Sequence, residues 1–129
     1  MIPSLVVLAT AAMLTGHPGT QVTEDMSARP VGFLGYADIP GQVIHMQPYL
    51  INELNNINTV PIAAATQAVL VLGHEATHLR GELNEKKCDA WATKNYYRIA
   101  RYLGATMKRV KAMKPWVKII NSLYVKEAG

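Results

Sequence analysis

The sequence predicts an α+β fold that is mostly helical and holds a candidate site on two neighbouring helices. Three observations predict it. A long apolar run, Ala63–Leu72, leads into the polar segment Gly73–Asp89, as expected of a buried helix that carries polar side chains into a core. Short β-like stretches precede this run, and stretches with helical periodicity follow it.

The length and composition are typical of one globular domain. The chain has 129 residues, of which 50% are hydrophobic and 17% charged, so residues 1–129 are expected to form a single domain. Within it we distinguish an apolar N-terminal stretch with a loop (1–30), short strands and a helix (31–60), the two helices that carry the candidate site (61–104) and a basic helical segment (105–129). The single cysteine, Cys88, excludes a disulfide framework and a zinc site of two or more cysteines.

The N-terminal stretch Met1–Leu14 is apolar but shorter than the about 20 residues that span a bilayer, so no transmembrane helix is expected. It has the length of a signal-peptide core, yet no basic residue precedes it and no clear cleavage site follows. A first core helix or strand is favoured over an export signal or the cut edge of a longer protein. A cytoplasmic location is slightly favoured over export. Gly16–Pro30 is expected to be a loop.

The next part of the chain predicts a small β-hairpin or edge strands packed on the site helix. Val31–Tyr36 and Gln42–Met46 are β-like and are separated by the turn-prone Asp38–Gly41. His45, in the second stretch, is expected to be structural. If a strand lies beside the site helix, its free edge could bind an extended peptide. Pro48–Asn56 predicts a short helix.

The two site helices have recognisable ends. The first is predicted over Pro61–Arg80, with Thr59 as its cap, Pro61 in its first turn and Gly81 as its stop. Asn84 is a plausible cap for a second helix that ends near Leu103. Since so short a link joins them, the two helices are expected to be adjacent and antiparallel.

Charge is distributed unevenly along the chain. Residues 1–79 contain one base, Arg29, and five acids, for a net charge of −4, whereas residues 80–129 carry +8. Met107–Lys114 predicts a basic helical stretch that ends at Pro115, and Trp116–Tyr124 predicts a last apolar-periodic stretch. This basic half could attract nucleic acid, an anionic membrane surface or an acidic substrate, although a solvated helix surface explains it as well.

The candidate site consists of two motifs. His74, Glu75 and His78 form H-E-x-x-H, and Glu85 and Asp89 form E-x-x-x-D. Residues four apart lie on one face of a helix, so the two histidines could share one metal ion. Glu75 lies about 100° further round the helix, where it could act as the base for a metal-activated water.

The antiparallel arrangement predicts which side chains meet. Glu85 is expected to face His78, and Asp89 to face His74 and accept a hydrogen bond from its ring. Two imidazoles and one carboxylate with an open fourth position are typical of a catalytic zinc site. If the turn extends further, Asp89 becomes the ligand, and Glu82 is a weaker possibility. Cys88 is expected to be a small packing residue; a metal role for it is the less favoured alternative, because the neighbouring carboxylates already supply the ligand spacing.

The segments HEATH and NEKKCD resemble the zincin metallopeptidases, specifically the gluzincin branch with its E-x-x-x-D second motif. The resemblance implies that His74, His78 and Glu85 bind one zinc ion. It also implies that Glu75 is the general base and acid, and that Asp89 supports a histidine ligand. The two motifs are closer together here than in well-known members, which leaves Glu85 and Asp89 as alternatives for the third ligand, with Glu85 favoured.

These observations predict a zinc-dependent metallopeptidase that hydrolyses peptide or protein substrates. An oxyanion-stabilising side chain would also be needed; Tyr49, Tyr96 and Arg80 are available, and nothing in the sequence selects one. The alternative is a zincin-like regulatory or binding protein that uses its basic half on nucleic acid or a membrane surface, with little or no turnover. A third reading is a helical domain in which the motif is accidental.

Overall fold

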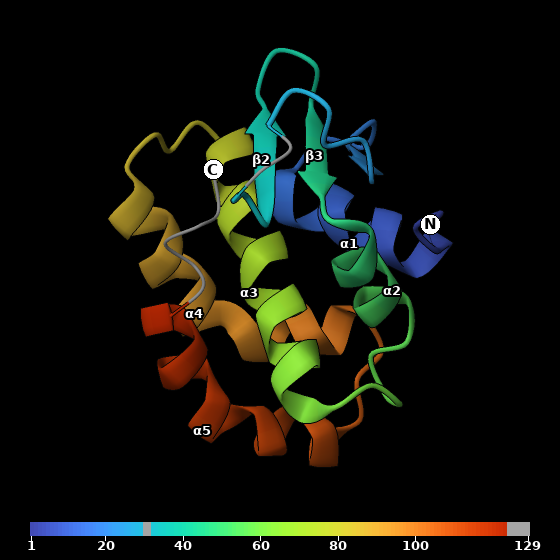
Figure 1. Ribbon diagram of the computed structural model, residues 1–129, viewed down its shortest axis with the longest axis vertical. Coiled ribbons are helices and arrows are strands. Elements are labelled where there is room, and N and C mark those ends of the chain that lie inside the picture. Colours follow the sequence, from blue (N-terminus) through green and yellow to red (C-terminus); the bar gives the residue numbers. More distant parts are fainter. Residues whose placement is uncertain (30–31, 124–129) are drawn as a thin grey trace.

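The structure is a computed structural model that describes residues 1–29 and 32–123 (Figure 1). It has an α+β fold dominated by helices, as the sequence predicts. In chain order the elements are α1 (Leu5–Thr15), β1 (Gln21–Thr23), β2 (Gly35–Asp38), β3 (Val43–Met46), α2 (Pro48–Asn55), α3 (Ile62–Leu79), α4 (Glu85–Tyr102) and α5 (Met107–Leu123).

Helix α3 is the element on which the others pack. It lies between α4 and α5 on one side and α1 and α2 on the other, with the sheet at its C-terminal end (Figure 1). Every residue from Ala68 to Leu79 is buried, which explains why this helix lacks the polar face of a surface helix. The polar residues at its C-terminal end are therefore held in a largely dry environment.

A glycine allows α3 and α4 to pack closely beside the site. A Cβ atom at Gly73 would lie 2.6 Å from Ile99 Cδ1 and 3.1 Å from Ala92 Cβ, distances that a larger side chain could not occupy without movement. Gly73 directly precedes His74, so this close approach also fixes how far the first histidine lies from α4.

The sheet has the order β1-β3-β2. Strands β2 and β3 form the predicted hairpin, pairing antiparallel from Gly35 with Met46 to Asp38 with Val43. The first predicted strand stretch, Val31–Tyr36, begins too early, because the strand starts at Gly35; Val31 itself lies outside the described residues. Within the described part of the chain β2 is an edge strand, and it packs against α3.

The sequence predicts a loop over Gly16–Pro30, but residues Gln21–Thr23 of this segment form strand β1. It pairs parallel with β3, Val22 being the partner of Ile44. Val22 and Ile44 are both buried, so the pairing is stabilised by a long-range contact that the polar composition of residues 16–30 does not reveal.

The N-terminal apolar stretch folds as a core helix, the first of the predicted alternatives. Ser4 caps α1 by accepting a hydrogen bond from the Val7 amide, and Val7, Ala11 and Leu14 are buried in the main hydrophobic cluster. Among the described residues, no helix combines the length and the apolar character that crossing a membrane requires.

The observed helix ends lie within two residues of the predicted ones. Two other predictions, the cap at Thr59 and the break at Pro115, are wrong. Thr59 does not cap α3: Pro61 occupies the cap position, and the Thr59 hydroxyl donates to the Asn56 carbonyl instead. The expected break at Pro115 is absent, because Pro115 lies inside α5. Pro115 and Lys111 are both exposed, so the Lys111 carbonyl that loses its helical partner can bond to water.

Candidate metal centre

The end of α3 and the start of α4 are brought face to face by residues 80–84. Gly81 adopts a φ of 105°, a left-handed conformation that glycine accommodates without strain. The predicted cap Asn84 is confirmed, since its side chain accepts a hydrogen bond from the Lys87 amide and begins α4. As a result, Glu85 in the first turn of α4 faces the last two turns of α3.

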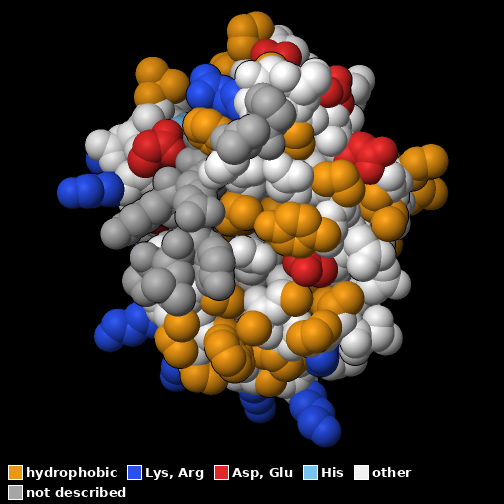
Figure 2. Space-filling view, viewed as in Figure 1, with side chains coloured by type: hydrophobic (Ala, Val, Ile, Leu, Met, Phe, Trp, Pro, Cys, Tyr) orange, Lys and Arg blue, Asp and Glu red, His pale blue; other side chains and the backbone are white. Residues whose placement is uncertain are grey.

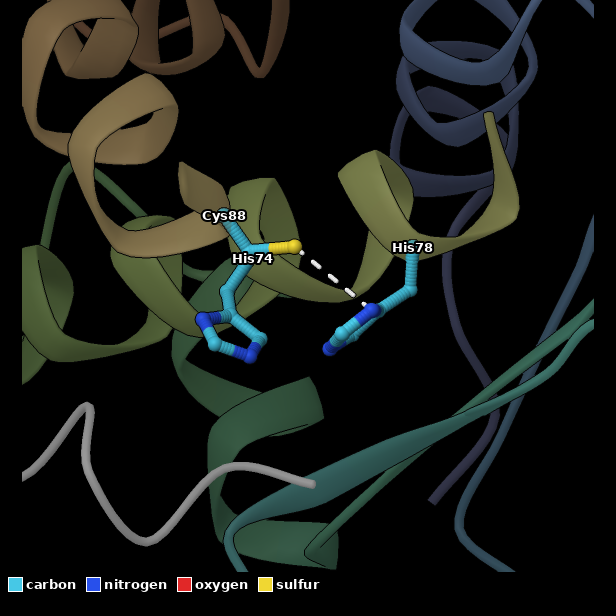
Figure 3. A group of neighbouring side chains, drawn as sticks. All are labelled: His74, His78 and Cys88. Carbon is cyan, nitrogen blue, oxygen red and sulfur yellow. Dashed lines mark hydrogen bonds between the residues drawn. The ribbon is translucent and has the colours of Figure 1, made fainter. Parts of the chain in front are cut away.

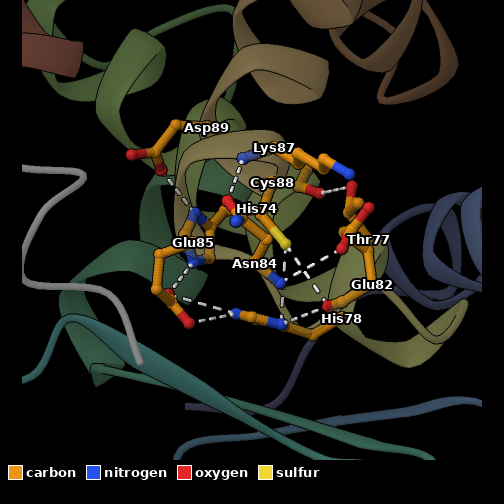
Figure 4. A network of polar contacts seen from close by, with 10 residues as sticks. His74, Thr77, His78, Glu82, Asn84, Glu85, Lys87, Cys88 and Asp89 are labelled. Atoms are coloured by element: carbon orange, nitrogen blue, oxygen red, sulfur yellow. Dashed lines mark hydrogen bonds and ion pairs between the residues drawn. The ribbon is translucent and has the colours of Figure 1, made fainter.

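His74 lies between the two acidic residues of the second motif (Figure 4). Its Nε2 atom is 2.8 Å from Glu85 Oε1, and its Nδ1 atom is 2.6 Å from Asp89 Oδ1. The ring is buried, whereas the Glu85 side chain is 55% exposed. Burial raises the pKa of the Asp89 carboxyl, and the neighbouring His74 opposes that shift. The predicted contact between Asp89 and His74 is therefore present.

His78 approaches the same carboxylate from the next turn of α3. Its Nε2 atom is 3.0 Å from Glu85 Oε2, and its Nδ1 atom is 2.7 Å from the Glu82 carbonyl oxygen. The two imidazole rings lie edge to face, with centroids 4.9 Å apart. Glu85 therefore meets both histidines, not only His78 as the sequence predicts. The Glu82 side chain accepts from the Asn84 amide, so its carbonyl contributes to the site and its carboxylate does not.

The partners of Nδ1 determine what Nε2 can do. A carboxylate and a carbonyl oxygen accept hydrogen bonds, so both contacts place the ring proton on Nδ1 and the lone pair of a neutral ring on Nε2. Both Nε2 atoms face Glu85, which is also an acceptor. Two ring lone pairs and an ionised carboxylate repel one another, so a proton or a metal ion shared among these atoms would be needed to hold them together.

Cys88 adds a sulfur atom beside this group (Figure 3). Donor atoms of His74, His78 and Cys88 lie within 4.8 Å of one another, and all three residues are buried, so this group could hold a metal ion. The Cys88 sulfur is 3.5 Å from His78 Nδ1 and 3.6 Å from the Glu82 carbonyl oxygen. Burial, reinforced by the surrounding carboxylates, raises the pKa of the Cys88 thiol to about 12. Without a metal it is a neutral thiol that donates to the Glu82 carbonyl.

Glu75 is a buried acid without a hydrogen-bond partner among the described residues. Neither carboxylate oxygen is bonded to any of them, which is costly for a buried polar group. Burial raises the pKa of this carboxyl well above its ordinary value, nearby Glu85 and Asp89 raise it further, and Arg29 lowers it. On its other side, Glu75 is covered by β2: a Cβ atom at Gly35 would lie 3.6 Å from Glu75 Cγ.

A cleft of about 470 Å³ opens beside His78 and Glu85. His78, Leu83 and Glu85 line one side, and residues of β2 and its approach line the other. That second set consists of Arg29, Phe33, Tyr36, Ala37 and Ile39. The cleft therefore joins two side chains of the candidate centre, His78 and Glu85, to the edge of the sheet.

None of the three oxyanion candidates named from the sequence lines this cleft. The Arg80 guanidinium donates to the Leu14 carbonyl and stacks on Trp91. Tyr96 packs against the hydrophobic core, and Tyr49 lines a groove beside α5. His45 is structural, as expected: it stacks on Tyr36 with ring centroids 4.1 Å apart. The cation in the cleft is Arg29, whose only sequence signal is that it is the single base before residue 80.

Comparisons of the chain with protein-family models and curated proteins, and of its fold with solved structures, found no match. The interpretation of this centre therefore rests on its own chemistry. Two imidazole nitrogens and a carboxylate oxygen are ordinary zinc ligands, and in a tetrahedral site such atoms lie about 3.3 Å apart. Glu85 lies 2.8 Å and 3.0 Å from the two Nε2 atoms, so these three side chains are close enough to one another to approach a single cation.

Proposed function

We propose that the protein is a zinc-dependent metallopeptidase in which His74, His78 and Glu85 bind one zinc ion. The observation that carries the proposal is the convergence of two lone-pair nitrogens on one carboxylate, with both opposite ring nitrogens held by acceptors. That arrangement aims three ligands at one cation and leaves room for a further one. We also propose that the chain is a short gluzincin-like zincin, on the basis of its HEATH and NEKKCD segments.

The positions of the competing donors favour Glu85. Asp89 contacts the Nδ1 side of His74, where a carboxylate orients a metal ligand and strengthens it as a base. Cys88 contacts the Nδ1 side of His78, so its use as a ligand would require His78 to give up the Glu82 carbonyl. Among the residues that the structure describes, only Glu85 meets the Nε2 atoms of both rings.

Zinc held by these residues would supply Lewis acidity, polarising a substrate carbonyl and lowering the pKa of a water molecule. Glu75 follows His74 on α3, and both of its carboxylate oxygens are free of hydrogen bonds to the described residues. We assign it the proton transfers: it accepts a proton from the attacking water and delivers that proton to the leaving amine. Burial shields this carboxylate from bulk water, so that its partner in the site is the reacting water.

The cleft supports a peptide as the substrate. Strand β2 presents Tyr36 and Ala37 to the same space as His78 and Glu85, and its other edge is paired with β3. An extended peptide can add to such a strand through main-chain hydrogen bonds, which would hold a scissile bond alongside the histidines.

Metal content and peptide cleavage together test the proposal. We expect one zinc per chain, lost in His78→Ala and Glu85→Ala and retained in Cys88→Ala, the control for the competing sulfur donor. Glu75→Gln should retain zinc and cleave no member of a peptide library that the unaltered protein cleaves. Zinc lost from Cys88→Ala but not from Glu85→Ala would refute the ligand set, and a zinc-loaded protein that cleaves nothing would refute the peptidase.

A surface on α5 favours a second candidate, binding to an anionic membrane surface. Four exposed lysines occupy this helix, Lys108, Lys111, Lys114 and Lys118. Trp116 and Ile119 are 40% and 48% exposed beside an apolar groove of about 360 Å³. Figure 2 shows hydrophobic side chains gathered over α5 and the start of α3, with Lys and Arg side chains around them. Basic residues bordering exposed tryptophan and aliphatic side chains are typical of interfacial helices.

Vesicle sedimentation tests this second candidate. We expect binding to vesicles that contain phosphatidylserine and none to phosphatidylcholine alone, with Lys114→Glu combined with Lys118→Glu reducing the bound fraction several-fold. Equal binding to both vesicle types, or binding only to DNA with a steep dependence on salt, would refute it.

A further inference from the structure

Arg29 gives the cleft a positive charge on the wall opposite the histidines. It belongs to the segment between β1 and β2, and it lines the cleft together with Phe33 and Tyr36 from that wall and His78 and Glu85 from the other. Two of the three proposed zinc ligands, His78 and Glu85, and this guanidinium therefore border one space of about 470 Å³.

Two aromatic rings position the guanidinium. Its central carbon is 5.2 Å from the Phe33 ring centroid and 5.9 Å from that of Tyr36, within the range of cation–π attraction. Tyr36 is itself fixed, because its ring stacks on His45 and its hydroxyl donates to the Asp25 carbonyl. Aromatic faces hold an arginine in place while leaving its N–H donors free.

The Arg29 guanidinium forms no ion pair with a carboxylate of residues 1–29 and 32–123. The ion pairs formed by these residues do not include Arg29. The acids of the adjoining cleft are engaged elsewhere: Asp25 accepts from the Ser27 amide, and Asp38 from the Gly41 amide.

From this geometry we propose, building on the peptidase function above, that Arg29 forms a subsite for a substrate carboxylate. The carboxylate lies close to the scissile bond and is either the free C-terminus of a short peptide or an Asp or Glu side chain. Arginine presents paired donors that match the two oxygens of a carboxylate.

The direction of the strand agrees with this assignment. Arg29 and Phe33 both precede β2, which runs from Gly35 to Asp38, and the Arg29 guanidinium lies over the rings of Phe33 and Tyr36, near the N-terminal end of the strand. A peptide that pairs antiparallel with β2 has its C-terminal end at that start, where its carboxylate meets Arg29. A parallel peptide would present its positively charged N-terminus there, which Arg29 repels. The charge therefore selects one orientation of the substrate.

The test is a ratio of activities on matched peptides. A peptide that the enzyme cleaves is prepared as the free acid, as the C-terminal amide, and as the amide with an Asp at the last position. We expect kcat/KM to be about 10- to 100-fold higher for one or both carboxylate forms than for the plain amide, as charge-assisted hydrogen bonds allow. The form that benefits identifies the source of the carboxylate.

Arg29→Ala should reduce this ratio to about 1, and Arg29→Lys should give an intermediate value, because lysine keeps the charge but not the paired donors. Lys94→Ala, which removes a cation from a different cleft, should leave the ratio unchanged. A ratio near 1 in the unaltered protein, or one insensitive to Arg29→Ala, overturns the subsite while leaving the peptidase intact.

A binding measurement separates the two proposals. Fluorescence anisotropy of the labelled free-acid and amide peptides on zinc-loaded Glu75→Gln should show the same preference without turnover, again lost with Arg29→Ala. If no peptide is cleaved by the unaltered protein, the peptidase fails. In that case, equal binding of the free-acid and amide peptides overturns the subsite. A preference for the free-acid peptide that is lost with Arg29→Ala supports the subsite.

Discussion

Substituting Gly73 by alanine tests the close packing of α3 on α4 that positions the site. The added Cβ atom would lie 2.6 Å from Ile99 Cδ1 and 3.1 Å from Ala92 Cβ, so both neighbours must move. Overpacking of this kind costs about 1–3 kcal/mol, and the higher helix propensity of alanine returns about 1 kcal/mol. The expected net loss in the free energy of unfolding is about 1 kcal/mol.

The structure also predicts how this loss is relieved. Ile99→Val removes the Cδ1 atom that the new Cβ approaches most closely, and alone it costs about 1 kcal/mol. In the double variant the two losses should not add, because the main clash is gone. We expect a coupling energy of about 1 kcal/mol in favour of the double variant. Ile120→Val, a buried residue of α5 in the other hydrophobic cluster, should show no coupling with Gly73→Ala.

Urea unfolding followed by circular dichroism, with a chelator present throughout, measures these free energies without a metal contribution. Losses for Gly73→Ala and Ile99→Val that add to within about 0.5 kcal/mol would refute the reasoning. Because Gly73 precedes His74, Gly73→Ala should also weaken zinc binding, and Ile99→Val should restore part of it.

Other substitutions test separate features. Asp89→Asn should weaken zinc binding about 10- to 100-fold without abolishing it, as measured by competition with a chromogenic chelator; full loss would make Asp89 a ligand. Gly35→Ala places a Cβ atom 2.7 Å from the His45 carbonyl oxygen and should lower the melting temperature, whereas an unchanged value would contradict the pairing of β2 with β3. Burial raises the pKa of Glu53 to about 7, so its contribution to stability is present below its ordinary pKa and lost as the pH rises through about 7. The melting temperature of the unaltered protein should therefore fall between pH 5 and 8 by more than that of Glu53→Gln. Parallel pH profiles of the two melting temperatures would exclude Glu53 as the cause. Pro115→Ala restores an amide donor inside α5 and should stabilise the protein by about 1–3 kcal/mol in urea; a loss of stability would mean that Pro115 has a packing role.

The parts of the fold that depend on local sequence were predictable. Asn84 and Gly81 mark the helix ends through their own hydrogen bonding and backbone preferences, which neighbours in space hardly alter. The contact between Asp89 and His74 also follows from local spacing, because both residues lie on adjacent helices joined by a short turn. The apolar run of α3 and the alternation in β3 could be recognised without knowledge of the rest of the chain.

The parts that depend on contacts across the chain were not predictable. Strand β1 exists because Val22 pairs with Ile44 on β3, and nothing in the sequence of residues 16–30 predicts that partner. Pro115 would end an isolated helix, but packing of α5 on α3 continues it. Arg29 lies far from His78 in sequence, and only the fold of the sheet against α3 places both in one cleft.

The side chains of the candidate centre all come from one continuous stretch, residues 74–89. The spacing of these side chains is thus fixed by a single helical hairpin, in which His74 and Asp89 are only 15 positions apart. The opposite wall of the cleft comes from a separate part of the chain, the segment around β2. Mutation could therefore diversify the recognition of substrates on that wall while the hairpin, as a transplantable unit, keeps its chemistry unchanged.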